Sequence, residues 1–363
     1  MNENKHSNWQ PYKFIKILKY LSYGIVYYAS RSSININYKL RKDFKLEHVN
    51  TLSLPISAVR KFDKINEEEI LQKQFGPLIM EFVNVIIDNI PNTYLTLFFN
   101  NLNTLNSLTK DFDLDNLLLN QHVQGEYLAN DNTIVLSKDN CCLTIDHELL
   151  HASTTIIDKS NSIILCGFQQ INKGRQIGEG LNEGYTQYLA EKYFGDKHKL
   201  LHAYLYEKRV AEILEIIVGE DLMKALYFNA NLMGLIEYLK QYNQEEEIYK
   251  FIRTLDFLNK HLEDKHLTES SFKIIFESLQ YINIFLIKTS LRKKFVNNSL
   301  NEQMDVFDLI YSLIPILNLL PANITSGNYK YEIVDNKLIN ENILAVMSEY
   351  TNEKQKKSLI KEI

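Results

Sequence analysis

Proline, glycine and cysteine are all scarce in this chain of 363 residues, which contains 6, 12 and 3 of them respectively. So few prolines and glycines argue against collagen-like, linker-rich and all-β architectures, and they favour a chain that is mostly helical. The three cysteines form neither a disulfide framework nor a Cys-x-x-Cys pair. We therefore expect a reducing, cytoplasmic location and no thiolate metal site; the cysteines are Cys141, Cys142 and Cys166.

The chain also lacks an excess of positive charge and any long apolar run. Its 40 basic and 45 acidic residues leave a formal net charge of −5, which argues against binding of nucleic acid. No uncharged apolar run approaches the ~18 residues of a transmembrane helix. Residues 13–30 are basic and then apolar, but their uncharged stretch from Tyr20 to Ser30 has only 11 residues. We expect a surface helix there, and contact with a membrane surface is the alternative.

The content of hydrophobic residues, 45%, with 23% charged residues is that of a globular protein, and the length favours more than one domain. Hydrophobic patterning predicts a helical N-terminal region over 1–120, a core of short strands and helices over 121–243, and a helical C-terminal region over 244–363. The predicted fold class is therefore α+β and mostly helical.

Within this core, β-branched residues and Asn-Asp turn chemistry predict two short strands, at 122–127 and 132–137. A helix is predicted over 139–158, and a second extended pair within 162–178, where Ile163–Phe168 and Arg175–Ile177 flank a turn. Helical spacing then resumes, and the predicted helices cover 181–194, 198–218, 221–228 and 232–242.

Residues 147–151 read His-Glu-Leu-Leu-His, an HExxH motif inside the predicted helix. Histidines four residues apart lie on one helix face, so His147 and His151 can converge on one metal ion. Glu148 is rotated by about 100° from His147, which lets it reach a water on the metal without ligating the metal. This pattern is typical of a zinc site that keeps one coordination position open.

A third ligand is expected from residues 178–190, which contain Glu179 and Glu183. Glu179 lies between two glycines at the start of a predicted helix, where an acidic residue offsets the helix dipole. Glu183 lies one turn further on among apolar residues, and burial of a carboxylate there is costly unless a cation compensates it. We therefore favour Glu183 as the third ligand, and Glu179 is the alternative.

The HExxH motif followed by Leu-Asn-Glu-Gly-Tyr-Thr at 181–186 resembles the gluzincins, the thermolysin-like zinc metallopeptidases. The resemblance covers residues 122–195 and implies that His147, His151 and Glu183 bind Zn²⁺. It also implies a zincin-like core with an edge strand above the site, and Thr133–Ser137 is in the matching place. The implied activity is hydrolysis of peptide bonds in a peptide or protein substrate, with Glu148 as the general base on a zinc-bound water.

The chain departs from this family in two places. His151 and Glu183 are separated by 31 residues, more than in thermolysin, and the extended pair within 162–178 accounts for the excess. Gln187 stands where the family has an aspartate, four residues after the glutamate. Thr186 and Gln187 are therefore candidates to orient one of the histidines.

Several roles stay open at the level of sequence. The donor that stabilises the oxyanion is one of His202, Tyr204 or Tyr206. Asp146, which precedes the motif, is expected to face solvent. The alternative function is that of a zincin-like module that binds peptides or proteins without cleaving them.

Overall fold

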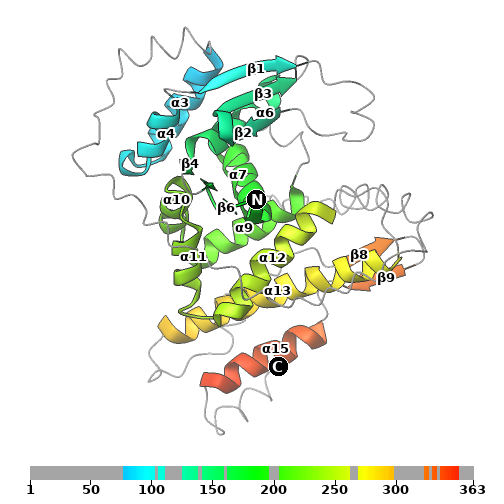
Figure 1. Cartoon of the computed structure of the whole chain (residues 1–363). Helices are drawn as coiled ribbons and strands as arrows, with labels where there is room; N and C mark the ends of the chain where they lie inside the picture. The colour runs from blue at the N-terminus through cyan, green and yellow to red at the C-terminus, as the bar shows by residue number, and fades with distance from the viewer. Residues whose placement is uncertain are drawn as a thin grey trace, which may run out of the picture. The chain divides into compact units, whose positions relative to one another are not determined.

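The structure is a computed structural model, in which residues 77–102, 105–110, 125–137, 141–158, 162–195, 204–261, 269–297, 323–326, 329–332 and 336–350 are described. The described part of the chain divides into two compact units, with the boundary between Asp256 and Phe257. Helices predominate in both and are accompanied by small sheets, which confirms the predicted fold class (Figure 1). The division at 120/121 and 243/244 stays a prediction.

The first unit contains a three-stranded sheet in the order β1-β3-β2. β1 (Asn106–Lys110) runs parallel to β3 (Thr133–Ser137), and β2 (Gly125–Leu128) runs antiparallel to it. The two predicted strands are thus confirmed. We expected Thr133–Ser137, which is β3, to be the edge strand, and this expectation is wrong. β1, which was not predicted, pairs with β3 on the side opposite β2. Among the described strands β3 is central, and β2 forms an edge of the sheet.

α6 (Cys141–Ser153) carries the HExxH motif and packs against β2 and β3. It ends well before the predicted boundary at 158, and β4 (Thr155–Asp158) follows it directly. Hydroxyl groups terminate the helix, because Ser153 Oγ donates to the carbonyl of Leu150 at 2.7 Å and Thr155 Oγ1 to that of His151 at 2.8 Å. The β-branched residues that follow favour a strand over another helical turn.

The four strands β4, β5 (Ile163–Cys166), β6 (Gln169–Asn172) and β7 (Arg175–Ile177) form an antiparallel meander. β5 and β7 confirm the predicted extended pair, whereas β4 and β6 were not predicted. Lys173 and Gly174 join β6 to β7, and both have positive φ values, as a two-residue hairpin turn requires. On one face of this sheet, Ile163 and Leu165 pack against Ala230.

α7 (Glu179–Phe194) follows β7 and packs against α6 and α9 (Leu205–Val218). Gly184 makes the contact with α9 possible, because a Cβ atom on it would lie 2.3 Å from the carbonyl oxygen of Glu207. The remaining elements of this unit are α3 (Pro77–Asn89), η2 (Asn92–Tyr94), α4 (Thr96–Leu102), η3 (Ala129–Asp131), α10 (Glu220–Phe228), α11 (Leu232–Leu239) and the part of α12 (Glu245–His261) up to Asp256.

The second unit contains α13 (Glu269–Asn297), the hairpin of β8 (Asn323–Ser326) with β9 (Tyr329–Glu332), and α15 (Asn336–Tyr350). α13 and α15 pack together through an Arg292–Glu349 ion pair at 3.2 Å and a stacked pair of rings, Phe295 and Tyr350. These contacts hold the two helices side by side.

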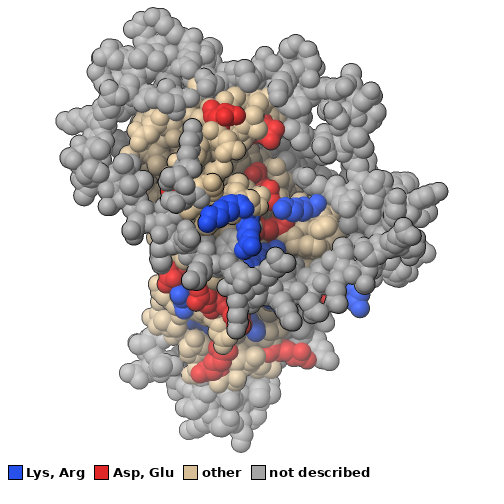
Figure 2. Space-filling view, viewed as in Figure 1, with Lys and Arg blue, Asp and Glu red and all other residues tan. Residues whose placement is uncertain are grey.

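The described helices include none with the length and apolar character needed to cross a bilayer. Residues 13–30, for which we considered contact with a membrane surface, lie outside the described residues. Figure 2 shows basic and acidic side chains close to one another on the face in view, in keeping with the nearly balanced composition.

Substitution of Gly184 tests the contact between α7 and α9. We expect Gly184→Ala to destabilise the protein by about 3 kcal/mol, the upper end of the range for overpacking, because the added methyl group meets backbone rather than a movable side chain. Gly174→Ala is the control: its Cβ would meet nothing within 4 Å, and only the positive φ penalises it, by about 1–2 kcal/mol. Denaturant unfolding of both variants measures the difference, and equal loss would show that helix contact at Gly184 is not limiting.

Candidate metal centre

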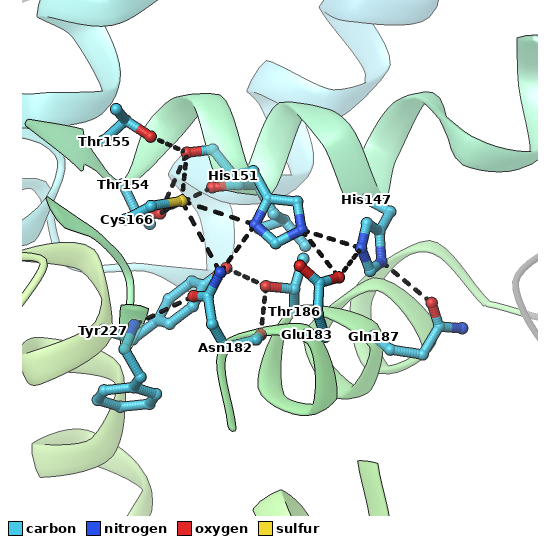
Figure 3. Close-up of polar contacts among 12 residues, drawn as sticks. His147, His151, Thr154, Thr155, Cys166, Asn182, Glu183, Thr186, Gln187 and Tyr227 are labelled. Atoms are coloured by element: carbon cyan, nitrogen blue, oxygen red, sulfur yellow. Dashed lines mark hydrogen bonds and ion pairs between the residues drawn. The ribbon is translucent and has the colours of Figure 1, made fainter. Parts of the chain in front are cut away.

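His147 and His151 from α6 and Glu183 from α7 point toward one another (Figure 3). The two Nε2 atoms are 3.0 Å apart, and Glu183 Oε2 lies 3.2 Å from His147 Nε2 and 3.3 Å from His151 Nε2. Three ligands that each lie 2.0–2.2 Å from a tetrahedral ion are about 3.3–3.6 Å from one another. Small outward movements of the three side chains would therefore accommodate a metal ion.

The structure brings together the three residues that the sequence singles out as ligands. The group of potential ligands formed by described residues contains Glu183 and not Glu179, which lies in the first turn of α7. Two imidazole nitrogens and a carboxylate oxygen are a common donor set for catalytic zinc. The geometry shows that this group could hold a metal ion, and the identity of the ion as zinc stays a prediction.

Burial and mutual charge decide the protonation of this group in the absence of metal. Burial by itself would lower the pKa of His151, but the Glu183 carboxylate raises it well above the ordinary value for histidine. Burial likewise would raise the pKa of Glu183, but the neighbouring histidines hold it well below its ordinary range. The metal-free site therefore favours an imidazolium at His151 beside a carboxylate at Glu183.

Glu148 adjoins the three potential ligands and is itself almost fully buried, with 7% of its surface exposed. Burial raises the pKa of its carboxyl group, and this effect outweighs the opposing attraction of His147 and His151. A carboxylate whose pKa is raised toward neutrality is a better proton acceptor at working pH than an exposed one. Its position and its proton affinity both fit the predicted role of general base.

Gln187 and Tyr204 contact the ring of His147. Gln187 Oε1 lies 3.1 Å from His147 Nδ1, so Gln187 is the candidate that orients this histidine in place of the family's aspartate. Tyr204 stacks on the same ring, with centroids 5.8 Å apart and planes at 16°. Tyr204 has a positive φ of 51°, which is unusual for a bulky residue and is often found at functional sites.

His151 is supported by different groups. Asn182 Nδ2 lies 3.2 Å and Cys166 Sγ 3.7 Å from His151 Nδ1, and Asn182 Oδ1 accepts a hydrogen bond from the backbone N–H of Phe168. A neutral His151 that binds metal through Nε2 carries its proton on Nδ1. Of the two neighbours only Cys166 Sγ can then accept this proton, because the NH₂ group of Asn182 only donates and is left to Cys166 Sγ, 3.8 Å away. This role of Cys166 could not be predicted from the sequence, because Cys166 lies on β5, outside both the HExxH helix and the segment 178–190.

Thr186, the other candidate to orient a histidine, stabilises Asn182 instead. Its hydroxyl donates to the carbonyl of Asn182 at 2.7 Å, and the Tyr227 hydroxyl lies 2.6 Å from it (Figure 3). Because the single hydroxyl proton of Thr186 is already donated, Tyr227 is the donor in the second bond. Thr186 thus contacts Asn182, which in turn contacts His151, and does not contact a histidine itself as we predicted.

Side chains from other elements fix the helix ends that flank the site. Asn101 Nδ2 in α4 donates to the carbonyls of Ala152 and Thr155 at 2.8 and 2.7 Å, where α6 ends. At the start of α7, the Asp256 carboxylate accepts hydrogen bonds from the backbone N–H groups of Gly178 and Gly180 at 2.9 and 3.0 Å. Both contacts satisfy backbone groups that a helix leaves without intrahelical partners.

The remaining predicted residues fall in different places. Tyr206 is buried in α9, and burial raises the pKa of its phenol well above the ordinary value. His202 lies outside the described residues. Asp146 is only 1% exposed, so the expectation that it faces solvent is wrong. Asp146 precedes His147 in the sequence, but the sequence does not reveal that this side of α6 is covered.

Comparisons of the chain with protein-family models, with curated proteins and with solved structures found no match.

Replacement of Glu183 and Glu179 in turn distinguishes the two candidate ligands. We expect Glu183→Ala to weaken metal binding by more than the roughly 10–100-fold that loss of a supporting residue costs, because it removes a direct ligand. Glu179→Ala should retain the metal. Elemental analysis of both purified variants decides between them, and equal retention would mean that Glu183 is not the third ligand.

Metal binding should also depend on pH in a defined direction. Because the metal-free site favours a protonated His151, binding of a metal through this residue must release a proton. Affinity should therefore rise by about tenfold per pH unit until the pH exceeds the pKa of His151. Competition with a chromophoric chelator at several pH values measures this slope, and an affinity that does not change with pH would contradict the protonation of His151 in the metal-free site.

Proposed function

We propose that the protein is a zinc-dependent peptidase of the gluzincin type that works in the cytoplasm on a peptide or protein substrate. The observation that carries the proposal is the convergence of His147, His151 and Glu183 from two helices, with Glu148 buried beside them. Histidine ligands to a structural metal do not need an adjacent buried carboxylate of raised pKa, whereas a hydrolytic site does.

The order of elements around the site supports the same class. Strand β3 precedes α6, the potential ligands come from α6 and α7, and β2 is an edge strand beside α6. The residue before Glu183 is Asn182, and its Nδ2 lies 3.2 Å from His151 Nδ1. The buried free thiol of Cys166 is in keeping with a reducing compartment.

Each residue then has a definite task. Zn²⁺, when bound, supplies the Lewis acidity that activates a water and polarises the scissile carbonyl. His147, His151 and Glu183 would hold it. Gln187 and Cys166 would accept the Nδ1 protons of His147 and His151, so that each Nε2 keeps the lone pair that binds the metal. Glu148 takes a proton from the attacking water and passes it to the leaving amine as the C–N bond breaks. Tyr204, the oxyanion candidate that contacts His147, is the proposed donor to the developing negative charge.

Glu148→Gln separates a peptidase from a binding module. The substitution keeps size and hydrogen bonding but removes the base, which contributes typically ~10²–10⁴-fold to rate. We expect the variant to retain metal and fold while hydrolysis of a mixed peptide library falls by about two orders of magnitude or more.

The alternative, a zincin-like module that binds peptides or proteins without cleaving them, predicts that the parent protein releases no products. A parent that cleaves peptides and a Glu148→Gln variant that cleaves them equally well would refute the proposed mechanism, even with the metal site intact. Glu126→Gln, on the neighbouring strand β2, is the matched control, because it also removes one carboxylate near Glu148.

A further inference from the structure

We propose that the Glu191–Lys208 ion pair is a positioning device for the metal site, which acts through Gln187 to hold His147 in the state that binds metal. The contacts form one chain. Lys208 Nζ lies 2.7 Å from both carboxylate oxygens of Glu191, Gln187 Nε2 donates to Glu191 Oε1 at 3.2 Å, and Gln187 Oε1 lies 3.1 Å from His147 Nδ1. The proposal rests on the proposed metal site, but it concerns residues that the resemblance does not assign.

The carboxylate of Glu191 determines which way the amide of Gln187 points. An amide has a donor end and an acceptor end, and an ionised carboxylate only accepts hydrogen bonds. The NH₂ group of Gln187 must therefore face Glu191, and its oxygen must face His147. His147 Nδ1 then carries the ring proton, and Nε2, which lies beside Glu183 and His151, keeps the lone pair that a metal needs.

Lys208 makes this arrangement sensitive to Glu191. The Lys208 ammonium and the Glu191 carboxylate are 11% and 15% exposed, so each depends on the other for compensation of its charge. Without Glu191, the ammonium group can only donate, and the amide of Gln187, which contacts the same Glu191 Oε1, offers its oxygen as a replacement acceptor. An amide oxygen drawn toward Lys208 would turn the NH₂ group toward His147, which selects the ring state protonated on Nε2.

The same pair connects the site to α9. Lys208 lies one turn after Tyr204, and its backbone N–H donates to the Tyr204 carbonyl at 2.8 Å. Tyr204 in turn stacks on His147. One helix end thus contacts the ring of His147 directly, through Tyr204, and indirectly, through Lys208, Glu191 and Gln187.

The test is a double-mutant cycle on metal affinity, measured by competition between Zn²⁺-loaded full-length protein and a chromophoric chelator. Glu191→Leu should weaken zinc binding by at least about tenfold, the low end of the loss for supporting residues. In the Gln187→Leu background the same substitution should change affinity by less than about twofold, because no amide remains to link Glu191 to His147. Ring nitrogen shifts in NMR spectra of the metal-free Glu191→Leu variant should show the His147 proton on Nε2.

Glu215→Leu is the matched control, because Glu215 also joins α7 to α9, through Lys192 at 3.0 Å, but is linked to no potential ligand by this chain of contacts. It should lower the melting temperature and leave zinc affinity unchanged. The proposal is overturned if Glu191→Leu binds zinc as the parent does, or if the loss is the same in the Gln187→Leu background. If the parent itself binds no zinc, the metal site fails, while the nitrogen shifts of the metal-free protein still test the orientation of Gln187.

Discussion

The close approach of α6 and α7 is the constraint on which the rest of the structure depends. Ligand atoms from the two helices lie within 4.8 Å of one another, so the helix backbones and their ends must be fixed closely. Asn101 fixes the end of α6, and Gly184 lets α7 lie against α9 on its other side. The meander from β4 to β7 returns the chain from the end of α6 to the start of α7, which explains why 31 residues separate His151 from Glu183.

The two histidines are equivalent in sequence but differ in their surroundings. His151 lies against the uncharged side chains of Asn182 and Cys166 (Figure 3). His147 is connected through Gln187 to an ion pair that spans two helices. An amide in place of an aspartate keeps the hydrogen bond to the ring but moves the negative charge one side chain further away, so a metal at this site would experience less negative charge nearby.

Sequence reasoning succeeded where the chemistry is local and failed where it depends on tertiary neighbours. The prediction that His147, His151 and Glu183 meet needed only local information. Helical geometry places residues four apart on one face, and the cost of burying a carboxylate among apolar residues indicates that Glu183 has a cation nearby. No local sequence pattern indicates that β1 pairs with β3, that Cys166 lies beside His151, or that Asp146 is buried. The end of α6 was predictable only in part. The sequence contains three hydroxyl residues at 153–155, but whether they cap a helix depends on the turn that follows.

The bidentate contact of Asp256 with the start of α7 has a consequence for how the protein can be dissected. A fragment confined to 121–243 would contain the HExxH motif and Glu183, yet it would lose the carboxylate that accepts from Gly178 and Gly180. It would also lose the backbone of Leu255, against which Gly180 is packed so closely that a Cβ atom would lie 2.7 Å from the Leu255 carbonyl oxygen. A fragment that preserves the entrance to α7 must therefore extend at least through Asp256, well past Glu183.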